Sequence, residues 1–289
     1  MTSASERRGF SVHIFLPDGD PAGVKIIEKS NWTGTGLLIP RTLFAQAKKR
    51  PELDRAGVYV LVGESETGTL PMVYIGEGDP VRNRVEKHGR AKDFWTHAVI
   101  FTGKDQNLNK AHVQRLESRL VELATRSKRC VLDNGNVPQP PSLSDADTAE
   151  VEGFLDEMLL CFPMLGYSFF EQASDQTHLD APTFFFRRRG TVASGAESPQ
   201  GFVVRAGSRA AKGETKSCHQ FLRNMRSELV RQVVLRDAGD GYELTQDYTF
   251  SSPSTAAGVM AGSNINGRKY WKTADGRTLK SVQEERGGA

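Results

Sequence analysis

The sequence predicts an α+β protein of two domains, and three observations lead to this fold class. Short β-branched and aromatic runs, bounded by Gly or Pro, are interspersed with amphipathic helical stretches. The length of 289 residues suffices for one large or two modest domains. The charge is uneven: residues 183–289 carry 17 Lys or Arg and 10 Asp or Glu, net +7, whereas the remainder is net −4. We therefore expect a β-rich extension at 1–50, a core domain at 51–175 and a basic domain at 183–289, with a polar boundary at 175–182.

The N-terminal extension is expected to contain strands and one short helix after eight disordered residues. Its predicted elements are a hairpin of 10–16 with 24–27, a strand at 32–39 and a helix at 40–49. Asp18 and Asp20 lie in the hairpin turn on either side of a glycine. This pattern favours turn chemistry over a metal-binding loop.

The core domain is expected to be organised around a hairpin of two strands, at 57–62 and 72–76. Alternation along each strand places Tyr59 and Tyr74 on the face opposite their aliphatic neighbours. Each strand can therefore bury an aliphatic face and present a phenol on the other. Gly76 would leave room for a ligand beside the phenols.

A helix is predicted directly after the hairpin. Asp79 is expected to cap it, with Pro80 at the first helical position. Arg84 and His88 lie four residues apart and therefore share a face of this helix. A third strand is expected at 94–101.

The next predicted helix, at 109–126, carries one carboxylate within its apolar stripe. Glu117 falls inside the arc of apolar residues, whereas Ser118 and the charged residues around it lie on the opposite face. A carboxylate in a buried stripe is unfavourable unless something pairs with it. An ion pair with an arginine is one interpretation. A metal ligand is favoured here because two tyrosines and Arg84 are expected nearby.

The segment after this helix is expected to be a loop at 127–143 with two candidate asparagines. Asn134 and Asn136 flank Gly135, and the alternative for each is simple turn chemistry. Ser144 is then expected to cap an acidic amphipathic helix that ends before Pro163. The carboxylates of that helix are expected to form a solvated face.

The basic domain is expected to combine short strands and helices. Its predicted elements are strands at 183–186, 201–205 and 242–244 and a helix at 220–234 with Val233 on its apolar side. A Ser-Ser-Pro run at 251–253 would cap a short Ala-rich helix whose N-terminus could receive a phosphate. Arg268, Lys269, Tyr270 and Trp271 could supply charge and a stacking surface. Burial of Trp271 in a core is the alternative.

The motifs of the core domain form a recognisable set. Gly57-Val58-Tyr59 and Tyr74-Ile75-Gly76, followed by Arg84, His88 and Glu117, resemble the signature of the GIY-YIG nuclease family, over roughly residues 56–137. The resemblance implies a small antiparallel or mixed sheet flanked by helices. Two positions depart from the pattern: Val58 replaces isoleucine, and Glu77 stands where relatives often carry a small polar or basic residue.

The resemblance also implies roles for individual residues. The expected catalytic residues are Tyr59, Tyr74, Arg84, His88 and Glu117, with Glu117 as the metal ligand. Gly76 and one of the two asparagines, Asn134 or Asn136, are expected at the substrate. The sequence does not decide which tyrosine would be the general base, and His88 could hold the phosphate or assist proton transfer.

The C-terminal stretch carries a second resemblance. Residues 248–279 resemble an uncharacterised domain that recurs behind GIY-YIG modules and is also attached to restriction enzymes and adenine methylases. This resemblance implies nucleic-acid contact, with Arg268 and Lys269 as candidate contact residues.

Composition argues against several classes of protein. No apolar run approaches the ~20 residues needed to span a bilayer, and the N-terminus lacks the apolar core of a signal peptide. The three cysteines are widely spaced, which indicates neither a disulfide framework nor a zinc knuckle. The Gly-rich phosphate loop of nucleotide hydrolases is missing from the sequence. We therefore expect a cytoplasmic protein.

The combined hypothesis is a metal-dependent endonuclease that hydrolyses DNA phosphodiester bonds, in restriction, phage defence or repair. Mg²⁺ suits a single carboxylate supplemented by waters and substrate oxygens, with Mn²⁺ as an alternative. Two other functions stay open: a non-cleaving nucleic-acid-binding protein with the nuclease fold, and a nuclease directed at RNA. The complete set of five catalytic candidates favours cleavage, because binding alone would not need it.

Overall fold

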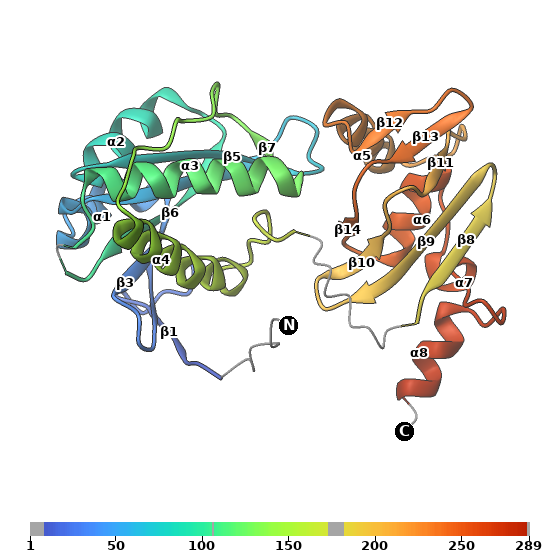
Figure 1. Ribbon diagram of the computed structural model, residues 1–289, viewed down its shortest axis with the longest axis horizontal. Helices are drawn as coiled ribbons and strands as arrows, with labels where there is room; N and C mark the ends of the chain where they lie inside the picture. The colour runs from blue at the N-terminus through green and yellow to red at the C-terminus, as the bar shows by residue number, and fades with distance from the viewer. Residues whose placement is uncertain (1–8, 106, 173–181, 288–289) are drawn as a thin grey trace. The chain divides into compact units, whose positions relative to one another are not determined.

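The computed structural model describes residues 9–105, 107–172 and 182–287 (Figure 1). It contains two sheets, each combined with helices, and the predicted α+β class with two folded parts is confirmed. Two expectations lie outside the described residues: disorder at 1–8, and the polar boundary at 175–182 except for its last residue. None of the helices in the described part of the chain is long and apolar enough to cross a membrane.

The chain divides into two compact units. The first comprises Met1–Glu66 and Leu70–Glu171, and the second comprises Thr67–Thr69 and Gln172–Ala289. The strands of the first unit are β1 (Val12–Phe15), β2 (Lys25–Lys29), β3 (Gly34–Pro40), β4 (Gly57–Glu64), β5 (Pro71–Gly78), β6 (Trp95–Gly103) and β7 (Val131–Leu132). Its helices are α1 (Phe44–Ala47), α2 (Val81–Ala91), α3 (Lys110–Ser127) and α4 (Asp145–Met164), with short 3₁₀ turns at Arg41–Leu43 and Pro51–Asp54.

The strands of the first unit form one sheet in the order β1-β2-β3-β6-β4-β5-β7. All neighbours are antiparallel except β5 and β7. Both predicted hairpins, β1–β2 and β4–β5, are therefore confirmed. Strand β3 pairs with β6 along its whole length. The N-terminal strands thus continue the sheet that contains the central hairpin.

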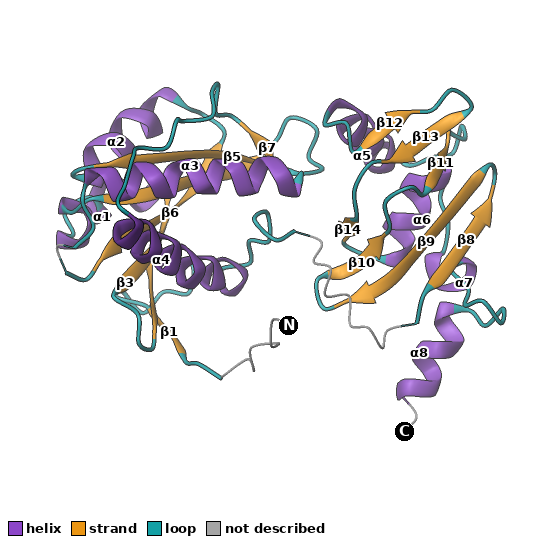
Figure 2. Cartoon of the chain, in the orientation of Figure 1, coloured by secondary structure: helices purple, strands orange, loops and turns teal. Residues whose placement is uncertain are grey.

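The two faces of this sheet bury different side chains, as the alternation predicts. Val58, Val60 and Ile75 belong to the core that α3 and α4 cover, whereas Tyr59 and Leu61 pack with residues of α1 and α2 on the other face (Figure 2). Because helices cover both faces of the sheet, the outcome for Tyr59 differs from the sequence-based prediction. The side chain of Tyr59 is fully buried rather than presented to solvent.

Several predicted details of the helices are wrong. Asp79 does not cap α2 and Pro80 is not its first residue: Pro80 is the extended N-cap, and the Val81 N–H donates to the carbonyl of Arg55. Ser118 is buried rather than on the polar face of α3, because its hydroxyl donates to the carbonyl of Pro138.

The predicted helix ends also need correction. Pro163 lies within the last turn of α4 rather than beyond its end, and the chain turns at Gly166 in the left-handed region. In the second unit, the helix predicted to reach residue 234 ends at Arg231. Val233 has φ +61° and is exposed, so it does not lie on an apolar helical face.

The second unit has its own sheet and core. Its strands are β8 (Phe184–Arg188), β9 (Thr191–Ser198), β10 (Gly201–Val204), β11 (Arg209–Ala211), β12 (Leu235–Asp237), β13 (Gly241–Leu244) and β14 (Tyr248–Phe250). Its helices are α5 (Gln220–Arg231), α6 (Pro253–Ala261), α7 (Gly267–Tyr270) and α8 (Leu279–Gly287). The sheet order is β12-β13-β11-β9-β10-β14, with β8 paired to β9. Ser252 caps α6 as expected, by accepting from the Thr255 N–H.

The edge of the first sheet beside β5 is completed by a side chain. Strand β7 pairs with β5 only at Met72 and Val73. Beyond it, the Asn134 side chain accepts from the Ile75 N–H at 2.9 Å and donates to the Ile75 carbonyl at 2.8 Å. Asn134 thus continues the ladder that β7 begins, whereas Asn136 is exposed on the same loop.

This geometry yields a prediction that separates the two asparagines. Asn134→Ala leaves the Ile75 amide and carbonyl without partners, which should destabilise the protein by about 1–3 kcal/mol. Urea unfolding measures that loss, and amide hydrogen exchange should show loss of protection at Ile75. Asn136→Ala is the matched control and should lie within about 0.5 kcal/mol of the wild type. Equal effects of the two variants would contradict the assignment.

Candidate active site

The hairpin register fixes the position of the two tyrosines. Tyr59 pairs directly with Gly76 across the β4–β5 ladder, so both face the same side of the sheet. A Cβ at Gly76 would overlap the hydroxyl and ring of Tyr59. The space beside Gly76 is therefore occupied by Tyr59 rather than by room for a ligand. Tyr74 lies near Tyr59, with 6.2 Å between ring centroids, and remains half-exposed.

Helix α2 places a row of basic side chains beside these phenols. His88 Nδ1 lies 2.5 Å from the Tyr59 hydroxyl, and its ring meets Tyr74 edge-on at 5.0 Å. Lys92, the C-cap of α2, places its Nζ 4.0 Å from the centroid of the Tyr74 ring and pairs with Asp133 at 2.5 Å. Sequence analysis missed Lys92. The signal was available, because Lys92 follows His88 by the same four-residue step that joins His88 to Arg84.

Helix α3 contributes Glu117 and a neighbouring ion pair. Glu117 is half-buried, as its place in the apolar stripe predicts. Glu77 on β5 is buried and accepts from Lys110 Nζ through both carboxylate oxygens at 2.6 Å. The charges of Glu77, Lys110 and Arg84 influence the pKa of Glu117. These residues of β5, α2 and α3 therefore share one electrostatic environment.

Glu117 and Arg84 are both left without a salt bridge. Among the described residues, neither forms an ion pair or a side-chain hydrogen bond. The arginines nearest to Glu117 along α3, Arg115 and Arg119, pair with Glu152 of α4 at 3.0 Å. The interpretation of Glu117 as half of an arginine ion pair thus has no counterpart in the described residues.

The surroundings of Glu117 oppose its ionisation. Burial, and then repulsion from Glu77, raise the pKa of Glu117 to about 7, although Arg84 and Lys110 act in the opposite direction. A carboxyl group whose ionised form is made unfavourable by burial and by a neighbouring carboxylate is typical of functional sites.

The pKa values of the two tyrosines and of His88 are shifted as well. Burial raises the pKa of Tyr59 well above its usual range, and burial together with the charge of Glu117 raises the pKa of Tyr74. Burial and then the positive charges of Arg84 and Lys92 lower the pKa of His88. The imidazole is therefore neutral at neutral pH, and both phenols keep their protons.

The other predicted site residues have a structural role, are exposed, or belong to the second unit. The amide of Asn134 is bonded at both ends to Ile75, so it positions β5. Asn136 is exposed and shows no side-chain contact among the described residues. Arg268 and Lys269 lie on α7 of the second unit, where Arg268 donates to Gln283 at 2.7 Å.

One carboxylate of this cluster fits a divalent cation. The described residues include no group of three or more His, Cys, Asp or Glu side chains arranged to hold a metal ion. Mg²⁺ does not need such a group, since it commonly binds one or two carboxylates together with waters and substrate oxygens. Glu117 is a half-buried carboxylate that has no hydrogen-bond or ion-pair partner in the described part of the chain, and it fits that requirement. Glu77 does not, because Lys110 occupies both of its oxygens.

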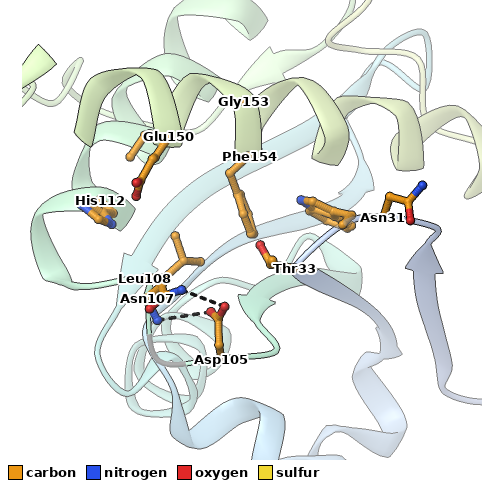
Figure 3. Close-up of a pocket in the computed structure, with 11 residues that line it drawn as sticks. Asn31, Thr33, Asp105, Asn107, Leu108, His112, Glu150, Gly153 and Phe154 are labelled. Atoms are coloured by element: carbon orange, nitrogen blue, oxygen red, sulfur yellow. Dashed lines mark hydrogen bonds between the residues drawn. The ribbon is translucent and has the colours of Figure 1, made fainter. Parts of the chain in front are cut away.

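A separate cavity of about 320 Å³ lies elsewhere in the first unit (Figure 3). It is lined by the loop before β3, the loop between β6 and α3, and α4. Asp105 accepts from the backbone and side-chain amides of Asn107, and His112 lies 3.5 Å from Asp147, whereas the buried Trp32 Nε1 has no hydrogen-bond partner among the described residues. None of the predicted catalytic residues lines this cavity, so it is distinct from the candidate site.

The comparisons with known proteins concern the second unit. Residues 184–283 match a domain of unknown function, DUF4357. The expected likeness of the C-terminal stretch to an uncharacterised domain is confirmed to that extent. The curated proteins and the solved structures give no match to the chain.

The raised pKa of Glu117 leads to a prediction about the stability of the protein. Because the pKa of Glu117 is higher in the folded state than its ordinary value of 4.5, wild-type stability is highest below that pH and falls as the pH rises to about 7. Glu117→Gln removes this loss and should stabilise the protein at pH 8 by on the order of 1–3 kcal/mol. Thermal unfolding at pH 5 and pH 8 measures the difference.

The matched control lies on the same helix. Glu122 is paired with Arg119 and Arg126, which hold its pKa below the ordinary value, so Glu122→Gln should not stabilise the protein at pH 8. Added Mg²⁺ should raise the unfolding temperature of the wild type and leave that of Glu117→Gln unchanged, because a ligand that binds only the folded state stabilises it. A Glu117→Gln protein that is less stable than wild type at pH 8 would contradict this account of the site.

Proposed function

We propose that the protein is a metal-dependent endonuclease that hydrolyses DNA phosphodiester bonds. One observation carries the proposal: an unpaired, half-buried Glu117 and an unpaired Arg84 share an electrostatic environment with a hydrogen-bonded Tyr59–His88 pair and Tyr74. Phosphodiester hydrolysis needs an activated water, neutralised phosphoryl oxygens and a stabilised leaving oxygen. This cluster has candidates for each of the three.

Arg84 suits the phosphate. Its guanidinium is permanently charged and presents forked donors that match two phosphoryl oxygens. Because it has no carboxylate partner, it can bind the substrate without breaking an ion pair. Its stem is held against the end of β5, where a Cβ at Gly78 would meet the Cβ and Cγ of Arg84. The helix and the strand thus aim the guanidinium.

The tyrosines divide into a positioning residue and a residue that can reach the substrate. Tyr59 is fully buried, so it acts through His88 rather than on the phosphate. The Tyr59 hydroxyl lies 2.5 Å from His88 Nδ1, and the tautomer that serves catalysis is the one in which Nδ1–H donates to this hydroxyl. In this arrangement the Nε2 lone pair of His88 is free to take a proton from water, and half-exposed Tyr74 can orient that water.

Glu117 would hold the cation. When bound, Mg²⁺ or Mn²⁺ supplies positive charge for the phosphoryl and leaving oxygens. Glu77 and Lys110 contribute a neutralised pair beside Glu117, so only one uncompensated carboxylate faces that position. This supports one metal ion rather than two.

The proposal predicts loss of cleavage in a Glu117 variant. Wild-type protein should nick or linearise supercoiled plasmid, unmodified or modified, in the presence of Mg²⁺ or Mn²⁺. Glu117→Ala should lower the rate by about 10²-fold or more, because the cation loses its protein ligand. Glu122→Ala is the control and should cleave like the wild type, since its carboxylate serves only surface ion pairs. Gel electrophoresis of the plasmid forms measures all three proteins.

Three other outcomes would each change the conclusion. Tight DNA binding without cleavage by any protein would support a non-cleaving binding protein. Cleavage of an RNA substrate alone would redirect the proposal to RNA. Equal cleavage by wild type and Glu117→Ala would place the site elsewhere.

A second prediction concerns the forked shape of the Arg84 guanidinium on α2. Arg84→Lys keeps the charge but loses the forked donors, and we expect kcat to fall by about 10²-fold with little change in stability. Arg82→Lys is the matched control on the same helix: Arg82 pairs with Asp54, and kcat should stay near the wild-type value. Initial rates on a labelled DNA substrate measure both variants. Equal activity of Arg84→Lys and wild type would remove Arg84 from the site.

A further inference from the structure

The second unit contains a groove of about 690 Å³ that includes none of the predicted catalytic residues. Its walls are the exposed side of β8 and the segment from α7 toward α8 (Figure 1). The side chains that matter for its chemistry are Phe185, Arg187, Arg188, Tyr270 and Lys272. All five lie within the region matched by the uncharacterised domain.

Alternation along the chain brings aromatic rings into this groove. Phe184 and Phe186 are fully buried, whereas Phe185 between them is 40% exposed. On the opposite wall, Trp271 is fully buried in the core and Tyr270 is 41% exposed. The alternative prediction that Trp271 belongs to a core is thus correct, and the stacking surface is formed by its neighbour instead.

Backbone hydrogen bonds join the two walls of the groove. The Phe185 N–H donates to the Lys272 carbonyl at 2.6 Å, and the Lys272 N–H donates to the Phe185 carbonyl at 3.0 Å. A further isolated bridge joins Lys272 to Thr278. The two walls are therefore fixed relative to each other before any ligand arrives, which lowers the entropic cost of binding.

Basic residues without an ion-pair partner in the described part of the chain gather on the elements that line this groove. Each of the ten acidic residues between 183 and 287 forms an ion pair with a basic residue of the same unit. The basic residues that have no ion-pair partner among the described residues are Arg187, Arg188, Arg189, Lys216, Arg268, Lys269 and Lys272. Six of these seven lie in β8, directly after it, or in the segment around α7, and three of them, Arg187, Arg188 and Lys272, line the groove. The groove therefore carries three positive charges without an ion-pair partner among the described residues.

The acidic residue closest in sequence to the groove does not neutralise it. Asp275 lies between two lining residues, but its carboxylate pairs with Arg277 at 2.8 Å and also accepts from Thr273. Arg188 instead lies over the ring of Tyr270, with its guanidinium carbon 4.5 Å from the centroid. An aromatic face beside an uncompensated guanidinium suits a flat ring attached to an anion.

We propose that this groove binds unpaired nucleotides of a nucleic-acid strand, with a base stacked on Tyr270 or Phe185 and phosphates held by Arg187 and Lys272. Base stacking on exposed aromatics within a basic groove is the usual mode of single-strand binding. A regular duplex is a poorer fit, because its base faces are already stacked on each other. The class of polymer is taken from the proposed function, but the site lies in the other unit and makes no use of cleavage.

The test measures binding in the absence of catalysis. Full-length Glu117→Ala protein in EDTA is titrated into a fluorescein-labelled single-stranded DNA oligonucleotide, and fluorescence anisotropy gives Kd. The same sequence as a blunt duplex and as single-stranded RNA forms two further arms. We expect the single strand to bind at least tenfold more tightly than the duplex. The RNA arm shows whether the sugar matters, since the groove as described selects unpaired bases.

Variants of the groove then locate the site. Adding Tyr270→Ala should weaken single-strand binding by about 5- to 100-fold, whereas Tyr270→Phe should retain it because the stacking face is kept. Lys272→Ala should weaken binding and reduce its dependence on salt concentration. Phe221→Ala and Lys280→Ala are the matched controls: Phe221 is an exposed aromatic on α5, and Lys280 is paired with Glu284 on α8. Both controls should bind like the parent protein.

Several outcomes would overturn the proposal. Equal affinity for the single strand and the duplex would remove the role of unpaired bases. Parent-like binding by both Tyr270→Ala and Lys272→Ala would place the contact elsewhere, and tighter binding of an acidic peptide than of the oligonucleotide would change the ligand class. Because no arm depends on hydrolysis, a protein without nuclease activity could still pass this test, and an active nuclease could fail it.

Discussion

The candidate active site depends on strand β5, because the two helices that carry its charges, α2 and α3, both pack against this strand. The ladder with β4 is continuous over eight residue pairs and fixes Tyr59 beside Gly76. On the opposite edge, the short strand β7 and the amide of Asn134 complete the hydrogen bonding. A register shift of one residue would turn both phenols into the aliphatic core and expose valines in their place. The chemistry of the site is thus a consequence of strand pairing.

The site also differs energetically from its surroundings. Elsewhere on α3, charged side chains pair with each other, with α4 or with β5, as Arg119 does with Glu122 and Glu152 and Lys110 with Glu77. Glu117 is half-buried next to a second carboxylate and has no such partner among the described residues. An ionised Glu117 lowers the stability of the folded state, so its presence is not explained by a contribution to folding. Destabilising groups of this kind are concentrated at binding and catalytic sites. Stability and function are therefore expected to oppose each other at this position.

The sequence predicted the faces of strands and helices, which follow from a periodic pattern. It did not predict features that depend on contacts between distant parts of the chain. The two-residue period of the hairpin predicted the faces of Tyr59 and Tyr74, and the helical period predicted the half-buried position of Glu117. It did not predict that helices cover both faces of the sheet, so the full burial of Tyr59 was missed. Nor could spacing separate Asn134 from Asn136, because the path of a loop has no period and only one of the two reaches Ile75.

Charge shows the same limit in both units. Composition predicts the net charge of the second unit, but the pairing of each acidic residue depends on how strands and helices are brought together. Arg205 and Asp247, for example, are 42 positions apart in the chain and are joined at the sheet. In the second unit, where every described acidic residue is paired, the cations around Phe185 and Tyr270 are left available to a ligand. In the first unit, Glu117 is half-buried and has no ion-pair partner among the described residues, so burial rather than lack of a partner sets it apart from the solvated charges of the surface. The signs of these groups suit a phosphate-bearing polymer with a cation.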